Sequence, residues 1–223
     1  MKLIILWGLL SSIIFANSNT AMQFSGVSST YKEKEINVKR LINPKCKKVG
    51  ITPNNIFGGN LSNKDISFEC KKSFITSLGT VQPIKIDSQI DTVGELEVLK
   101  FLELLEFEPH LYALIDVRTS QWYENMTIPN AINIPYTEIE EDEDFPNDSI
   151  RLFKLLNIIK DKNENLDFSN AKKIVVFCNA SWCVQSVLAI KSLIKIGYPK
   201  NKILWFRGGL EDWAGLGFTT VKP

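Results

Sequence analysis

The chain has 223 residues, of which 44% are hydrophobic and 23% are charged, and its 26 Lys and Arg residues nearly balance its 25 Asp and Glu residues. This length allows one well-buried core with an appendage, but not two large domains. Because the balanced charge offers no global attraction to a polyanion, we predict no nucleic-acid partner.

The first residues have the layout of a secretory signal peptide. A positive start at Met1-Lys2 precedes an apolar run from Leu3 to Ala16, which ends in small residues. The apolar run has about 14 residues, short of the ~20 that span a bilayer. We therefore predict a bacterial protein with a signal peptide over residues 1–18, a periplasmic or secreted location, and no stable membrane span after cleavage. An uncleaved anchor is the alternative.

Residues 19–80 form a predicted N-terminal extension. They are rich in Ser, Asn, Lys and Gly and contain few periodic apolar runs, so they are poorly suited to bury a core alone. Export favours the oxidation of paired cysteines, and both Cys46 and Cys70 fall in this segment. We predict a Cys46–Cys70 disulfide, which would contribute about 3 kcal/mol in the chain-entropy picture. Two unpaired thiols are the alternative.

From residue 81 onward, strand-like and helix-like patterns alternate along the chain. The predicted strands cover residues 81–86, 112–117, 131–134, 173–177 and 203–206. The predicted helices cover residues 93–107, 120–125, 148–159, 186–196 and 210–216. Gly197 is expected to end the fourth helix. This alternation predicts an α/β fold in which helices flank a mostly parallel central sheet.

Four motifs occur in order between residues 84 and 220. They are Leu114–Arg118 (LIDVR), Ile128–Pro135 (IPNAINIP), Ile174–Cys178 (IVVFC), and Gly197-Tyr198 with Leu204–Trp213 (LWFRGGLEDW). Together they resemble the signature of the rhodanese-like (sulfurtransferase) domain family. The resemblance implies a rhodanese-like domain over residues 81–223, preceded by the small irregular extension. For Asp116 and Arg118 we predict a structural role, with Arg118 in a salt bridge; the alternative is that Arg118 supplies the cation that the site lacks.

The resemblance places Cys178 at the position of the family's sulfur-carrying cysteine. Ligands of open α/β sheets bind beyond the carboxyl ends of the strands, and Cys178 follows a predicted strand. Backbone N–H groups of the next loop and of the following helix start would favour a thiolate there. A thiolate can attack a sulfur donor and hold the extra sulfur as a persulfide. A buried structural cysteine is the alternative.

The loop after Cys178 is predicted to be two residues longer than in the family. It contains Asn179, Ala180, Ser181, Trp182, Cys183, Val184, Gln185 and Ser186. Gln185 stands where the family usually has a basic residue, and an amide brings no charge, so we expect weak use of thiosulfate. Trp182 is predicted either to cap the pocket or to pin the loop by packing. Arg207 is predicted either to contact an anion or to lie on the surface.

Cys183 leads to a separate hypothesis. It lies five residues after Cys178, and a disulfide needs Cα atoms about 4.4–6.8 Å apart, so bonding requires a tightly curled loop. We hypothesise that Cys183 resolves the Cys178 persulfide, releasing sulfide and leaving a disulfide. The alternative is that Cys183 packs as a small apolar residue.

The predicted function is therefore sulfane-sulfur transfer or carriage through a persulfide on Cys178. It requires a small sulfur donor and a thiol or protein acceptor. A thiol–disulfide redox module using Cys178 and Cys183, and a non-catalytic binding domain of the same fold, are the alternatives. With His110 as its only histidine, the chain gives no pattern of a metal site, and no cofactor is predicted.

Overall fold

The structure is a computed structural model that describes residues 79–139 and 146–223, together with short pieces at residues 25, 27–31, 34–38, 45–46, 52–53 and 67. The predicted signal peptide and most of the predicted extension lie outside the described residues. Within the extension, β1 (Val27–Tyr31) and β2 (Lys34–Val38) pair as an antiparallel hairpin. Cys46 is buried and disulfide-bonded, and its predicted partner, Cys70, lies outside the described residues.

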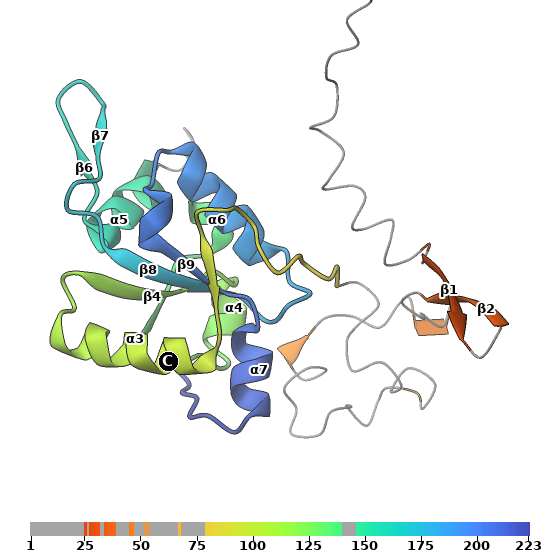
Figure 1. The fold of residues 1–223 in the computed structure, drawn as a ribbon. Helices are drawn as coiled ribbons and strands as arrows, with labels where there is room; N and C mark the ends of the chain where they lie inside the picture. Colours follow the sequence, from red (N-terminus) through yellow and green to blue (C-terminus); the bar gives the residue numbers. More distant parts are fainter. Residues whose placement is uncertain are drawn as a thin grey trace, which may run out of the picture.

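A parallel sheet of five strands forms the centre of the domain (Figure 1). Its order is β3 (Asp91–Val93), β9 (Ile203–Phe206), β8 (Lys173–Phe177), β4 (Tyr112–Asp116) and β5 (Ala131–Asn133). All four pairings are parallel. Strands covered on both faces read as continuous apolar runs, and the β-branched run of β8 is of this kind. The predicted α/β fold with a mostly parallel central sheet is confirmed.

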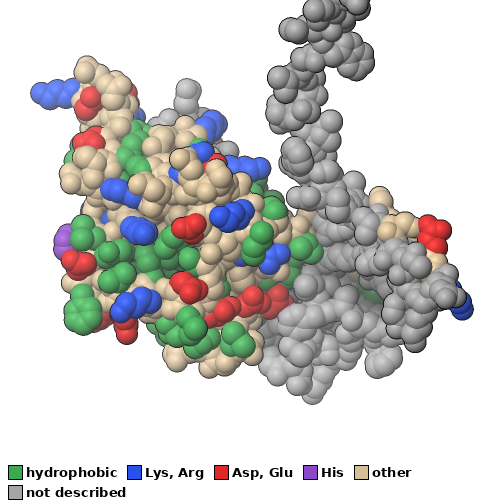
Figure 2. All heavy atoms as spheres, viewed as in Figure 1, with side chains coloured by type: hydrophobic (Ala, Val, Ile, Leu, Met, Phe, Trp, Pro, Cys, Tyr) green, Lys and Arg blue, Asp and Glu red, His purple; other side chains and the backbone are tan. Residues whose placement is uncertain are grey.

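Helices cover both faces of this sheet. The α3 helix (Glu95–Phe107) and the α7 helix (Gly209–Gly215) lie on one face, and α5 (Pro146–Leu156) and α6 (Gln185–Lys195) lie on the other (Figure 1). The short α4 helix (Ser120–Tyr123) follows β4. Figure 2 shows exposed hydrophobic side chains over α3, interspersed with acidic and basic ones; Leu96 and Phe107 are among the exposed residues.

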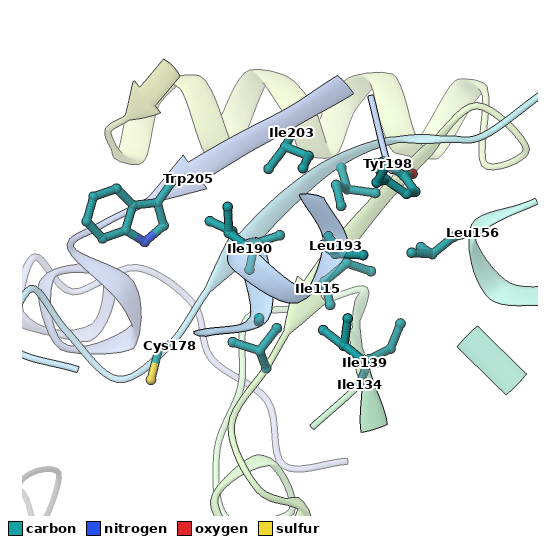
Figure 3. Packing of buried hydrophobic residues seen from close by; sticks show 14 of the residues in the cluster. Ile115, Ile134, Ile139, Leu156, Cys178, Ile190, Leu193, Tyr198, Ile203 and Trp205 are labelled. Atoms are coloured by element: carbon teal, nitrogen blue, oxygen red, sulfur yellow. The ribbon is translucent and has the colours of Figure 1, made fainter. Parts of the chain in front are cut away.

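The larger core lies between the sheet and α6. Ile115 of β4 and Trp205 of β9 face Ile190 of α6, and Cys178 lies at the margin of this cluster (Figure 3). Trp205 Nε1 donates to Ser186 Oγ at 3.1 Å, and both residues are buried. The core therefore fixes the start of α6 relative to the carboxyl ends of the strands, where the loop after Cys178 begins.

The predicted strand at residues 81–86 is wrong. This segment is irregular, and the sheet edge is instead the short β3, which the sequence did not predict. Also unpredicted are the hairpin of β6 (Ile159–Lys160) and β7 (Leu166–Asp167) and the single turns Tyr136–Glu138 and Lys200–Lys202.

The other predicted elements of the domain are confirmed, with small shifts of their ends. The strands at 173–177 and 203–206 have the predicted bounds. The α6 helix begins one residue earlier than predicted, and Gly197 follows its end with φ +96°, a conformation that glycine adopts readily. No helix within the described ranges is both long and apolar enough to cross a membrane.

Candidate active site

Cys178 is the first residue after β8, at the carboxyl end of the middle strand, and is only 2% exposed. Its carbonyl oxygen accepts a hydrogen bond from the Leu210 backbone N–H at 3.0 Å. Gly209 sits directly against this backbone, with φ +63°, and a Cβ there would lie 2.4 Å from the Cys178 carbonyl oxygen. Only glycine therefore allows the start of α7 to pack so closely on the backbone of Cys178.

Cys178 is joined to Cys183 by a disulfide bond, with the two Cα atoms 6.3 Å apart. The loop curls as this bond requires, since the Cys183 backbone N–H donates to the Ala180 carbonyl oxygen at 2.9 Å. Cys183 is buried like Cys178, with 6% of its surface exposed. The close approach that the hypothesis on Cys183 needs is present, while the persulfide step itself stays a prediction.

The side chain of Gln185 lies against both sulfur atoms. Its amide oxygen is 3.4 Å from Cys178 Sγ and 3.8 Å from Cys183 Sγ. Gln185 is the first residue of α6, so the helix start presents this amide to the cysteine pair. When the pair is reduced, the amide can accept from a thiol, or turn and donate an N–H to a thiolate.

A pocket of about 250 Å³ adjoins the disulfide. Its walls come from α4, from the loop after Cys178 and from the segment just before the domain: Gly79, Thr80, Trp122, Asn179, Trp182, Cys183, Val184 and Gln185. Cys183 belongs to this wall, whereas Cys178 does not. None of these lining residues carries a formal charge, so the described part of the pocket is neutral and mainly apolar.

The segment Gly79–Pro83, here called the strap, is tied across the loop. The backbone N–H of Thr80 donates to the Trp182 carbonyl oxygen at 3.1 Å, and that of Gln82 donates to the Ser181 carbonyl oxygen at 2.8 Å. The Arg207 guanidinium donates to the Gln82 carbonyl oxygen at 2.8 Å. It also reaches the carbonyl oxygen of Pro83 at 3.1 Å.

The structure places Arg207 outside the pocket lining and Trp122 within it. Arg207 is absent from the pocket lining, and its guanidinium donates to the backbone of the strap, while its contact with an anion stays a prediction. Trp122 lines the pocket from α4, a position that no local sequence pattern indicated. The strap was likewise missed, because its partners lie about a hundred residues further along the chain.

Comparison with known proteins decides the family. Residues 98–216, more than half of the chain, match the Rhodanese-like domain family. The chain belongs to this family. It is 27% identical over 155 residues to "Adenylyltransferase and sulfurtransferase MOCS3" of Dictyostelium discoideum. This aligned region covers 65% of the chain and 34% of that protein. The MOCS3 protein of Arabidopsis thaliana is 27% identical over 154 residues, covering 68% of the chain and 29% of that protein. The chain thus spans about a third of these relatives.

Two solved structures are similar to this rhodanese-like chain. A thiosulfate sulfurtransferase from Pseudomonas aeruginosa has a TM-score of 0.41 and 20% identity, over 59% of this chain and 20% of the other. A rhodanese with anions from E. coli has a TM-score of 0.33 and 27% identity, over 50% of this chain and 99% of the other.

A buried ion pair is hydrogen-bonded to the loop that follows Cys178. Asp116 and Arg118 have fully buried side chains, and Arg118 Nη2 lies 2.6 Å from Asp116 Oδ2. Thr127 Oγ1 donates to the same carboxylate at 2.8 Å. Arg118 Nη1 donates to Asn179 Oδ1 at 3.2 Å, which links the ion pair to the residue that follows Cys178.

Trp182 is buried in the loop, with only 2% of its surface exposed, and it also lines the pocket, so the choice between its two predicted roles stays a prediction. Its indole Nε1 donates to Glu211 Oε2 at 2.9 Å, and the Glu211 backbone N–H donates to the Asn179 carbonyl oxygen at 2.8 Å. Glu211 Oε1 is buried without a hydrogen-bond partner among the described residues. Burial raises the pKa of Glu211 to about 7, the Trp182 hydrogen bond opposes this rise, and the charge of Asp212 adds to it.

This carboxyl should make stability fall with rising pH. Because its pKa moves from 4.5 when unfolded to about 7 when folded, the folded protein keeps a proton that the unfolded chain releases between those values. The contribution of Glu211 is therefore full below its unfolded pKa and is lost as the pH rises through about 7. We expect Glu211→Gln, which can still accept from Trp182, to flatten the decline in unfolding free energy between about pH 5 and about pH 8.

Urea unfolding at several pH values checks this expectation. Glu103→Gln is the control, because it removes an exposed carboxylate that pairs with Lys100 on α3. A pH slope that is the same in Glu211→Gln as in the wild type would refute the assignment.

No cluster of His, Cys, Asp or Glu within the described ranges is arranged to hold a metal ion.

Proposed function

We propose that this protein transfers or carries sulfane sulfur through a persulfide on Cys178. The observation that carries the proposal is the position of Cys178 at the carboxyl end of the middle strand, bonded to Cys183 beside a small pocket. Membership of the rhodanese-like family supports it, as does the sulfurtransferase activity named for the MOCS3 relatives. The acceptor in this proposal is a thiol or a protein.

The chemistry begins from the reduced pair. The Cys178 thiolate attacks the outer sulfur of a donor persulfide, forming a Cys178 Sγ–S bond, and the donor leaves as its thiolate. The positive end of the α6 helix dipole favours the negative charge of the thiolate and of the persulfide. Gln185 can donate to the same charge from the first residue of α6. The 250 Å³ pocket limits the donor to a small molecule or to a narrow group on a larger one.

The neutral pocket favours neutral or polysulfide donors over thiosulfate. We expect weak thiosulfate activity in the wild type, since no lining residue supplies a cation for this dianion. Gln185→Arg should raise kcat/KM for thiosulfate about tenfold, equivalent to one charge-assisted hydrogen bond of about 1.4 kcal/mol. The control is Leu188→Arg, which adds the same charge at an exposed position on α6 outside the lining. Efficient wild-type turnover that gains nothing from Gln185→Arg would refute this account of donor choice.

A single-turnover transfer assay tests the proposed function. The reduced Cys183→Ser protein, which keeps Cys178 but cannot form the Cys178–Cys183 disulfide, is loaded with glutathione persulfide, freed of small molecules and mixed with cyanide, and the thiocyanate formed is measured. We expect thiocyanate formation above the protein-free blank, with a yield of at most one molecule per chain. A yield equal to the blank would contradict the proposal.

The disulfide also favours a second function, a thiol–disulfide redox module that uses Cys178 and Cys183 without a sulfane sulfur. This function predicts that the oxidised protein converts an external dithiol to its disulfide. The rate should be the same whether or not the buffer contains a sulfane-sulfur donor. Sulfane-sulfur transfer predicts thiocyanate from the loaded protein, which a pure redox module cannot form.

Export to the bacterial periplasm is part of the proposal, since it rests on the signal-peptide pattern of residues 1–18. An oxidising compartment would also favour the Cys178–Cys183 disulfide, which a thiol then has to reduce before the next cycle. Determining the N-terminus of the protein isolated from a cell fraction tests this. A mature protein in the cytoplasm that still begins at Met1 would refute it.

A further inference from the structure

We propose that Cys183 is the internal acceptor of the Cys178 persulfide, and that a small thiol then regenerates the site by attacking Cys183. The inference rests on the proposed persulfide on Cys178. It makes the protein a converter of sulfane sulfur to sulfide, driven by a low-molecular-weight thiol.

The loop holds the two sulfurs together from several sides. The Leu210 N–H binds the Cys178 carbonyl, and the Cys183 N–H binds the Ala180 carbonyl. The strap binds the carbonyls of Ser181 and Trp182. Since this framework keeps the two cysteines within bonding distance, Cys183 competes with external acceptors as an intramolecular nucleophile.

The resolving step balances without another reactant. The Cys183 thiolate attacks Cys178 Sγ of the persulfide, so the bond between Cys178 Sγ and the outer sulfur breaks as the Sγ–Sγ bond forms. The outer sulfur leaves with the electron pair and a proton as hydrosulfide. That sulfur is reduced, and the two cysteine sulfurs are oxidised to the disulfide that the structure contains.

The pocket determines which sulfur of the disulfide meets the reducing thiol. Its wall includes Cys183 but not Cys178, and Cys183 is the more exposed of the two, at 6% against 2%. Attack on Cys183 expels Cys178 as a thiolate beside Gln185, the first residue of α6, so the Gln185 amide and the helix dipole stabilise it as a leaving group. A second thiol molecule then frees Cys183, so two thiols become one external disulfide.

The resolving step is tested by comparing the wild type with Cys183→Ser. Both are reduced, freed of reductant and given one equivalent of glutathione persulfide, after which sulfide release and intact mass are followed. We expect the wild type to release one sulfide per chain and to become two hydrogens lighter than the reduced protein. Cys183→Ser should keep one extra sulfur atom and lose it at least about tenfold more slowly.

The outcomes separate the two proposals. Equal persulfide lifetimes, or equal sulfide release, in the two proteins would overturn the role of Cys183 and leave the Cys178 persulfide standing. A Cys183→Ser protein that never gains sulfur would overturn the proposed function, and this inference with it.

The regenerating step is tested on the oxidised wild-type protein. It is treated briefly with free cysteine as the reducing thiol, quenched with N-ethylmaleimide and sequenced by fragmentation in a mass spectrometer. We expect the mixed disulfide with free cysteine on Cys183 and the maleimide on Cys178. The reverse arrangement, with the mixed disulfide on Cys178, would overturn the proposed entry through the pocket.

Discussion

Cys178→Ser should reduce thiocyanate formation from a persulfide donor by at least about a thousandfold, to the protein-free rate. A serine hydroxyl stays protonated at neutral pH and cannot form a sulfur–sulfur bond, so the variant has no carrier for the transferred sulfur. The initial rate with glutathione persulfide and cyanide measures the effect.

Cys183→Ser is the matched control, because it also removes the disulfide and changes sulfur to oxygen at a buried position of the same loop. It should still load sulfur and deliver it to cyanide. Substantial transfer by Cys178→Ser would exclude Cys178 as the carrier. Equal loss in both variants would indicate that the disulfide maintains the loop rather than that Cys178 carries sulfur.

Arg118→Met should lower the free energy of unfolding by about 3–5 kcal/mol, since it leaves the fully buried Asp116 carboxylate without its cation. Arg118 also donates to Asn179, so the variant should loosen the residue next to Cys178. Thr127→Val, which removes one hydrogen bond to Asp116, should cost about 1 kcal/mol. Urea unfolding measures both.

Lys100→Met is the control for this series. Its ion pair with Glu103 is largely exposed, at 70% and 63% of the two side chains, so its loss should fall within experimental error. A loss of stability no larger in Arg118→Met than in Lys100→Met would contradict the importance of the buried pair.

The central part of the fold could be predicted because its signals are local. The run Lys173–Phe177 is almost purely apolar and β-branched, and the strand has the predicted bounds. The segment 81–86 alternates apolar and polar residues, but Gln82 within it and Thr80 just before it donate to the loop instead of pairing with the sheet. Extended backbone alone does not reveal its partner, and the true edge strand, Asp91–Val93, is too short to give a periodic signal.

The candidate site also has parts that the sequence predicts and parts that it does not. Cys178 and its loop could be identified from motifs that are contiguous in the chain. Glu211 could not, because its raised pKa results from burial beside Trp182, a contact between α7 and a loop 29 residues earlier in the chain. The hydrogen bond from Arg207 to the strap could not be predicted either, because Gln82 lies 125 residues before it in the chain.

Localising the transferred sulfur tests the central claim most directly. The Cys183→Ser protein, which cannot resolve a persulfide through the disulfide, is loaded with glutathione persulfide, quenched in acid and fragmented in a mass spectrometer. The account predicts one extra sulfur atom, located on Cys178. Protein without extra sulfur, or with the sulfur on any other residue, would contradict it.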